Sequence, residues 1–304
     1  MRKYLILTAF LALSIAGCGS RDKAANRPVN KNENPDVLVK NAVEARTSLS
    51  SIAGKGVMRI VDQPSKFGLT VNADVVADDN DRLRIRGDKL AGAIQAFDVV
   101  KLGDDIGFYV PTQKTLYHGK TYDLQGFAFS FDPDEVLRQM LQPDTSLTLK
   151  RWRHADPRQD DPANTIVLEE DLPGNRPHLR LAISQKSGML TAVTQLDGRG
   201  QPVFVKRFDD FRDLSRSRKG GRVEADDSAF PYLMSFTWPR ERRSMEMHFK
   251  QVEGNAPVYD EDFDIAASSD TRYLPLREAQ MDPGMSDDEP LAAMPRGPTR
   301  EGRM

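Results

Sequence analysis

The chain has 304 residues, of which 39% are hydrophobic and 29% are charged, and its 43 basic side chains nearly balance its 45 acidic ones. A formal net charge of -2 excludes a strongly basic nucleic-acid-binding protein. The hydrophobic content is too high for a wholly disordered chain, and the single cysteine excludes an internal disulfide. By length alone, the chain forms either two domains or one large β domain.

Residues 1–17 have the layout of an export signal. Arg2 and Lys3 precede an apolar run from Tyr4 to Ile15, which is shorter than the roughly 20 residues that span a bilayer as a helix. The residues Ile15-Ala16-Gly17-Cys18 resemble a bacterial lipobox, in which the cysteine is diacylated and becomes the new amino terminus. The alternative is an ordinary signal peptide with an unrelated cysteine. We expect lipidated Cys18 to anchor the mature chain to a membrane.

Both ends of the mature chain lack any helix or strand periodicity. Residues 18–35 predict a lipidated cysteine followed by a flexible tether, and residues 278–304 predict a disordered tail rich in proline and glycine. Residues 36–277 are expected to form one domain. Gly19 and Ser20 lack the acidic residue that retains some lipoproteins on the inner membrane, so an outer-membrane location facing the periplasm is allowed in a Gram-negative cell.

The apolar pattern first indicates a helix and then many strands. Asn34-Pro35-Asp36 predicts a helix start, and Leu38, Ala42, Ala45 and Leu49 fall on one helical face. From Gly54 onward the apolar period changes to two, which is typical of strands. Strands are predicted at 67–75, 82–86, 95–99, 106–110, 147–153, 165–170, 178–184, 190–196, 202–208, 232–238 and 245–252.

A second, short helix interrupts this series of strands. Asp132-Pro133-Asp134-Glu135 is a capping arrangement that opens the segment 136–141, and Pro143 ends it. The fold class predicted is mainly β (α+β): an incomplete antiparallel β-barrel, or strongly curved sheet, with both helices covering an apolar concave face. An alternating strand does not reveal whether that face is packed core or a lipid cavity. The candidates for its wall are Val57, Ile60, Leu69, Val71, Leu83, Ile85, Phe97, Phe108, Leu181, Val193, Phe236 and Phe249.

Several stretches carry a resemblance to a known family. They are Leu49–Gly56 leading into a strand, Asp81–Ile85, Gly188–Val193 with Asp197–Gly200, Pro231–Pro239, and Met247–Val252. From about Asp36 to Ile265, the order of elements resembles the LolA/LolB-like lipoprotein-carrier superfamily. The resemblance implies a half-barrel that binds acyl chains or lipoproteins and assists their sorting or transfer at the cell envelope, without catalysing a reaction. RseB-like relatives of this superfamily imply the alternative, an envelope sensor or scaffold that binds a protein partner.

The sequence offers two kinds of candidate for contact with the membrane. In LolB-type proteins an apolar loop residue meets the membrane, and its counterpart here is Leu90; an ordinary hairpin is the alternative. The cations Arg216, Arg218, Lys219 and Arg222 form a basic cluster, and Arg240–Arg243 form another. Either cluster fits anionic headgroups, or simply forms a solvated loop.

Catalytic and metal-binding patterns are weak. The four histidines show no zinc-ligand spacing. Asp78–Asp81 fits a hairpin turn better than a calcium loop, because Arg82 and Leu83 break the ligand pattern. Gly54-Lys55-Gly56 lacks the spacing of a phosphate loop. We therefore predict a protein without enzymatic activity, metal or cofactor; a hydrolase is the least supported alternative.

Overall fold

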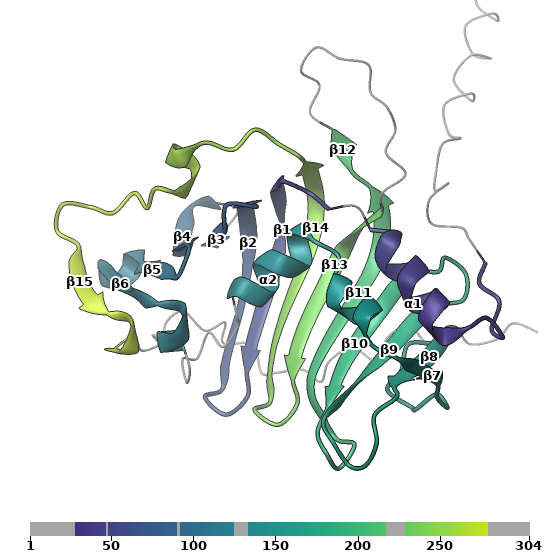
Figure 1. Cartoon of the computed structure of the whole chain (residues 1–304). Helices are drawn as coiled ribbons and strands as arrows, with labels where there is room; N and C mark the ends of the chain where they lie inside the picture. The colour runs from purple at the N-terminus through teal and green to yellow at the C-terminus, as the bar shows by residue number, and fades with distance from the viewer. Residues whose placement is uncertain (1–27, 47, 90–91, 125–132, 217–228, 279–304) are drawn as a thin grey trace, which may run out of the picture.

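The computed structural model describes residues 28–46, 48–89, 92–124, 133–216 and 229–278. Most of these residues lie in one curved sheet (Figure 1). Its strands are β1 (Ser51–Asp62), β2 (Phe67–Asp78), β3 (Arg82–Lys89), β4 (Ile94–Leu102), β5 (Asp105–Val110), β6 (Thr115–Lys120), β7 (Trp152–His154), β8 (Thr165–Glu170), β9 (His178–Ser184), β10 (Leu190–Leu196), β11 (Pro202–Asp213), β12 (Ser215–Arg216), β13 (Ala229–Trp238), β14 (Arg243–Gly254) and β15 (Arg272–Pro275).

The strand order explains why the barrel is incomplete. β1 pairs with β2 on one side and with β14 on the other, so strands from the two ends of the series meet in the middle of the sheet. The described sheet ends at β15 and β7 and does not close on itself. Its order is β15-β6-β5-β4-β3-β2-β1-β14-β13-β11-β10-β9-β8-β7, with β12 paired to β14 off this path.

Two α-helices lie on the same face of the sheet, which we call the inner face (Figure 1). α1 (Pro35–Glu44) begins as predicted, because the Asn34 side chain accepts a hydrogen bond of 2.9 Å from the Asp36 amide. α2 (Pro133–Leu141) lies between β6 and β7 in the chain. One hydrophobic cluster joins both helices to the inner face, so the main core lies between helices and sheet.

Three local predictions need correction. α1 ends at Glu44, so Leu49 is buried beyond the helix rather than on its face. The strand predicted at 147–153 is instead a 3-10 helix, η4 (Thr145–Leu149), followed by the short β7. β6 was not predicted, because His118, Gly119 and Lys120 end its apolar alternation.

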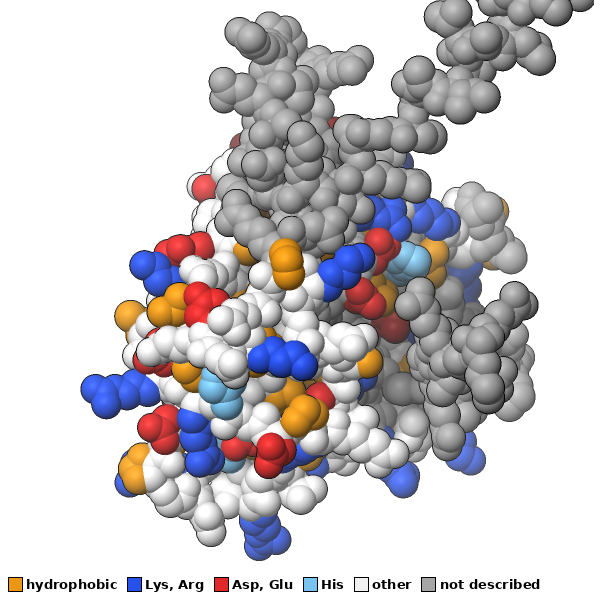
Figure 2. All heavy atoms as spheres, turned by 90° about the vertical axis from the view of Figure 1, so that its right-hand side faces the viewer, with side chains coloured by type: hydrophobic (Ala, Val, Ile, Leu, Met, Phe, Trp, Pro, Cys, Tyr) orange, Lys and Arg blue, Asp and Glu red, His pale blue; other side chains and the backbone are white. Residues whose placement is uncertain are grey.

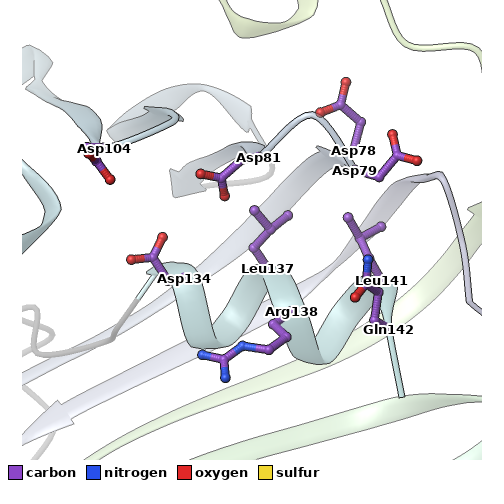
Figure 3. Close-up of a pocket in the computed structure, with 9 residues that line it drawn as sticks. All are labelled: Asp78, Asp79, Asp81, Asp104, Asp134, Leu137, Arg138, Leu141 and Gln142. Atoms are coloured by element: carbon purple, nitrogen blue, oxygen red, sulfur yellow. The ribbon is translucent and has the colours of Figure 1, made fainter. Parts of the chain in front are cut away.

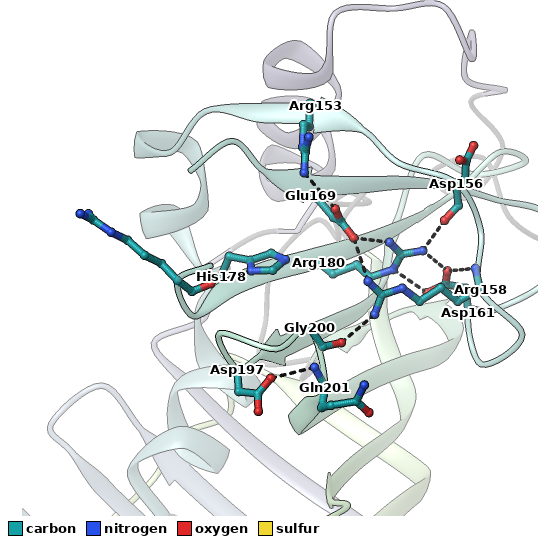
Figure 4. Close-up of polar contacts among 11 residues, drawn as sticks. Arg153, Asp156, Arg158, Asp161, Glu169, His178, Arg180, Asp197, Gly200 and Gln201 are labelled. Atoms are coloured by element: carbon teal, nitrogen blue, oxygen red, sulfur yellow. Dashed lines mark hydrogen bonds and ion pairs between the residues drawn. The ribbon is translucent and has the colours of Figure 1, made fainter. Parts of the chain in front are cut away.

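The opposite, outer face is covered in two places by loops. The segment after β14, with the 3-10 helix η5 (Asp260–Phe263), lies against β3, where Arg84 donates to the Asp262 carbonyl at 2.9 Å. On β9, the buried Arg180 donates to Glu169 at 2.6 Å, to Asp161 at 2.5 Å and to the Asp156 carbonyl at 2.6 Å (Figure 4). Arg180 therefore fixes the loop between β7 and β8.

Candidate functional site

The candidate site is the region where α2 crosses the inner face of the sheet. The apolar side of α2 consists of Val136, Leu137, Met140 and Leu141, which are all buried in the core cluster. The helix contacts β1, β2 and β3. It therefore covers apolar sheet positions that would otherwise face solvent.

A buried lysine from β4 holds the first turn of α2. The Lys101 side chain is fully buried, and its Nζ lies 2.5 Å from Oδ1 of Asp81 and 2.9 Å from Oδ1 of Asp134. Burial by itself lowers the pKa of Lys101, but the hydrogen bonds that it donates to both carboxylates outweigh burial and raise the pKa above its usual value. The lysine is thus charged, and an acidic residue in the first turn also complements the helix dipole.

A second lysine holds the same turn from the other half of the sheet. Nζ of Lys206, on β11, lies 2.7 Å from Oε1 of Glu135, and the lysine is 7% exposed. Gln139 donates to the same carboxylate at 3.0 Å. Because β4 and β11 lie on opposite sides of β1 in the strand order, these two ion pairs fasten α2 across the middle of the sheet.

Arg46, between α1 and β1, contacts α2 in a different way. Its Nη2 donates a 2.6 Å hydrogen bond to the carbonyl oxygen of Gln139, and its guanidinium lies 5.6 Å from the centre of the Phe208 ring. Burial lowers the pKa of Arg46 to about 10. Among the described residues no carboxylate lies within ion-pair distance of it, so its charge is compensated there by a neutral carbonyl and a ring.

One side of α2, from Asp134 to the residue just after the helix, Gln142, lines a pocket of about 350 Å³. Figure 3 shows Leu137 and Leu141 pointing toward the turn that carries Asp78, Asp79 and Asp81. The described residues include no group of three or more histidine, cysteine or acidic side chains arranged to hold a metal ion. Two of these carboxylates are already satisfied, because Asp78 binds Arg82 and Asp81 binds Lys101.

The proposed wall residues occupy the inner face with one exception. Val57 is half-buried and pairs with the exposed Asn72 and His248, so it lies on the outer face, while Met58 takes the inner position. Residues of a regular strand three positions apart point to opposite faces, so Val57 and Ile60 do not share one. The others all belong to the buried core cluster: Ile60, Leu69, Val71, Leu83, Ile85, Phe97, Phe108, Leu181, Val193, Phe236 and Phe249.

Several predicted positions lie outside the described residues. They are Cys18 with the export signal, Leu90, and the cations Arg218, Lys219 and Arg222. The backbone of Arg216 lies in β12 beside Gly254. His118, His154, His178 and His248 lie on four different strands. In the described part of the chain, no helix is both long and apolar enough to span a membrane.

The residues that hold α2 were missed in the sequence, although a signal was present. Lys101 follows Phe97 and Val99 in the inward phase of its strand, and Lys206 stands between Phe204 and Phe208 in the same way. A lysine in an apolar phase requires a carboxylate partner. The sequence does not show which carboxylates these are, because Asp134 and Glu135 come near the lysines only when α2 lies on the sheet.

No family model and no curated protein matches this chain. Among solved structures it is similar to a DUF1329 family protein from Desulfovibrio piger, with 13% identity, 76% of this chain and 96% of that chain covered, and a TM-score of 0.49. A domain from Vibrio parahaemolyticus, described as a candidate outer membrane lipoprotein-sorting protein, shares 11% identity over 77% of this chain and 97% of its own, with a TM-score of 0.48. A LolA superfamily protein from Nitrosomonas europaea shares 11% identity over 77% of this chain and 98% of its own, with a TM-score of 0.44.

Proposed function

We propose that this chain is a membrane-anchored cell-envelope lipoprotein that binds a lipid or a lipoprotein acyl chain between α2 and the inner face of the sheet. The observation that carries the proposal is the way α2 is held. A short helix with one apolar side covers a continuous apolar surface, and charged groups from both halves of the sheet fasten it. A ligand that takes the place of α2 must therefore carry acceptor oxygens for Lys101 and Lys206, because these buried cations lose their carboxylates on the helix when it moves away.

The energies of helix and ligand are comparable. The buried side chains of Val136, Leu137, Met140 and Leu141 on α2 contribute about 1.5–3 kcal/mol each, or about 6–12 kcal/mol together. A saturated acyl chain of about 15 methylene groups contributes about 12 kcal/mol when buried. An acyl chain can therefore take the place of α2 on the inner face without a large loss of apolar burial.

Arg46 indicates which ligand chemistry fits. When α2 moves away, its guanidinium loses the Gln139 carbonyl and needs a new acceptor. A carboxylate, phosphate or ester oxygen beside the acyl chain supplies one. The proposed ligand is therefore an amphiphile with an oxygen-rich head and an apolar chain, and no reaction is involved.

The test uses the full chain purified from bacterial membranes. Intact mass spectrometry before and after solvent extraction is expected to show a lipidated Cys18 and a separate, extractable lipid. In parallel, a fluorescent fatty acid and its methyl ester are titrated into the protein. The wild type is expected to prefer the acid, and Arg46→Gln to lose that preference, while Arg240→Gln, at a hairpin tip, behaves as wild type. Absence of both extractable lipid and probe binding would overturn the proposal.

A groove on the outer face favours a second candidate, an envelope sensor or scaffold that binds a protein. The groove has a volume of about 480 Å³ and lies between β4–β6 and the segment around Phe263 and Ile265. Leu102 at its edge is 47% exposed. A photo-crosslinking residue at position 102 is expected to trap a membrane-spanning envelope protein in cells, and one at position 240, at the tip of the β13–β14 hairpin, is expected not to trap it. Equal crosslinking at both positions would argue against this candidate.

A further inference from the structure

A second surface, at one end of the β7–β8 pair, is apolar and exposed. Leu149, just before β7, is 87% exposed, the highest value among the large hydrophobic side chains that the structure describes. Leu172, just after β8, is 39% exposed. The Asp171 amide donates to the Arg151 carbonyl at 2.8 Å, and each leucine lies within two residues of this bond. The two leucines therefore flank the same end of the strand pair.

Two arginines and one carboxylate lie near these leucines in the chain: Arg151, Arg176 and the exposed Asp171, which makes no ion pair among the described residues. Arg151 and Arg176 are exposed, and neither has a carboxylate within ion-pair distance in the described part of the chain. Lys150 is 2.6 Å from Glu170, so its charge is compensated. We call Leu149, Arg151, Leu172 and Arg176 the leucine–arginine patch. Figure 2 shows this side of the molecule, where basic, acidic and hydrophobic side chains are interspersed.

The segment that presents Leu149 is held in place on both sides. The Trp152 indole donates to the Leu147 carbonyl at 2.9 Å, and the Trp152 amide donates to Asp36 at 2.8 Å. Leu147 and Trp152 are buried, whereas Leu149 between them points to solvent. Its exposure is therefore set by a fixed backbone and is not the fraying of a loop.

The start of the described chain lies beside the same edge of the sheet but at the opposite end of its strands, because Gln185 follows β9 next to the start of β8, whereas Leu172 follows the end of β8. The Val29 amide donates to the Gln185 carbonyl at 3.0 Å, and the Glu33 carbonyl lies 3.1 Å from Nε2 of His154 on β7. Cys18 precedes Pro28 by ten residues, which span at most about 35 Å. A lipid on Cys18 would thus keep the β7 edge close to the bilayer.

From exposure, charge and tether length, we propose that the leucine–arginine patch docks on an anionic lipid bilayer. The leucines insert among the acyl chains, and the arginines bind phosphate oxygens of the headgroups. In this proposal the anchor on Cys18 limits the distance of the domain from the membrane, and the patch sets its orientation. This surface is separate from the inner face, so it does not depend on the ligand proposed above.

The test uses the full mature chain with Cys18→Ser, so that the anchor does not dominate binding. It is sedimented with vesicles of phosphatidylglycerol and phosphatidylethanolamine, or of phosphatidylcholine alone, at low and high salt. We expect binding to the anionic vesicles that weakens with salt. Leu149→Ser with Leu172→Ser should weaken it about tenfold or more. Arg151→Gln with Arg176→Gln should abolish the preference for anionic vesicles.

The matched control is Leu102→Ser, which removes an exposed leucine far along the sheet and should bind like the parent protein. Circular dichroism checks that each variant is folded. Absence of binding to anionic vesicles at low salt, or an equal loss in Leu102→Ser, would overturn the proposal. So would self-association that the leucine variant abolishes without any vesicle binding, because the patch would then contact a second copy. Fatty-acid probe binding at the inner face should be the same in all patch variants.

Discussion

Nζ of Lys101 on β4 lies 2.9 Å from Oδ1 of Asp134 in the first turn of α2. The lysine is fully buried, whereas the aspartate side chain is 46% exposed. The ion pair therefore joins the interior of the sheet to the outer end of a helix that covers it. Without Asp134, Lys101 is a buried cation without full compensation. Without Lys101, Asp134 is an exposed carboxylate that water can hydrate.

Lys101→Met tests whether this pair holds the helix. Methionine fills a similar volume, and both carboxylates are exposed enough to remain hydrated, so the free energy of unfolding should change by less than about 2 kcal/mol. The amides of α2 should nevertheless exchange faster by hydrogen–deuterium exchange mass spectrometry, because the first turn is released. Lys55→Met, which removes an exposed pair with Asp74, is the control and should leave α2 unchanged. Unchanged protection of α2 in Lys101→Met would contradict this prediction.

Glu135→Gln should be more harmful than Lys101→Met, because it leaves a buried cation. Lys206 is only 7% exposed, and its nearest other carboxylate, Asp144, is 3.9 Å away. We expect a loss of about 2 kcal/mol or more in urea denaturation. The matched change Glu44→Gln removes a surface i,i+4 pair with Lys40 and should cost at most about 0.5 kcal/mol. Similar losses in the two variants would show that the Lys206 pair is not buried in solution.

Local patterns explain how much of the fold could be predicted. β9 and β10 have the predicted bounds, because their alternation of apolar and polar residues is regular and turn residues end them. The Asn34 cap was also readable, since the capping hydrogen bond is local. β15 was not predicted, because the strand it pairs with, β6, lies far earlier in the chain. Four residues are too few to show an alternating pattern, and they give no sign of a partner so far away in the chain.

The site was harder to predict than the fold. Alternation assigned most inner-face residues correctly, but a one-residue difference in phase placed Val57 on the outer face. Arg46 stands inside the segment predicted as a helix, next to the polar residues that follow Ala45, so nothing in the sequence marks it as a contact of α2. Its surroundings come from α2 and from Phe208, which are distant in the chain. The usable sequence signal was a lysine at an inward-facing position of a strand, and it did not reveal which carboxylate the lysine binds.

The outer-face network predicts a pH dependence. Burial alone raises the pKa of Asp161, but hydrogen bonds from Arg180 and from the Arg158 amide outweigh it and lower the pKa below its ordinary value (Figure 4). A group with a lowered folded pKa adds stability above its unfolded pKa of about 3.9, and that stability is lost as the pH falls through the folded pKa. Asp161→Asn should therefore be less stable than wild type at pH 7, and the difference should narrow below about pH 4.

Thermal unfolding between pH 2 and pH 7 measures this dependence. The control is Asp171→Asn, an exposed aspartate whose side chain makes no ion pair among the described residues. It should follow the wild type throughout the range. A constant difference between Asp161→Asn and wild type at all pH values would mean that the variant acts through packing and not through the charge of Asp161.

Gly56 on β1 should tolerate no side chain. A Cβ there would clash with the carbonyl oxygen of His248 and would lie 2.9 Å from Cα of Phe249, both in the backbone of β14. Because backbone atoms cannot rotate away, β1 and β14 would have to separate where the two halves of the sheet join. Gly56→Ala should therefore cost about 1–3 kcal/mol in urea denaturation. Gly68→Ala on β2 has nothing within 4 Å of its Cβ and should be neutral or stabilising by about 0.5–1 kcal/mol, since alanine loses less conformational entropy than glycine on folding. Equal effects of the two substitutions would mean that β1 and β14 approach less closely in solution, and the junction of the two halves would then not constrain the inner face that α2 covers.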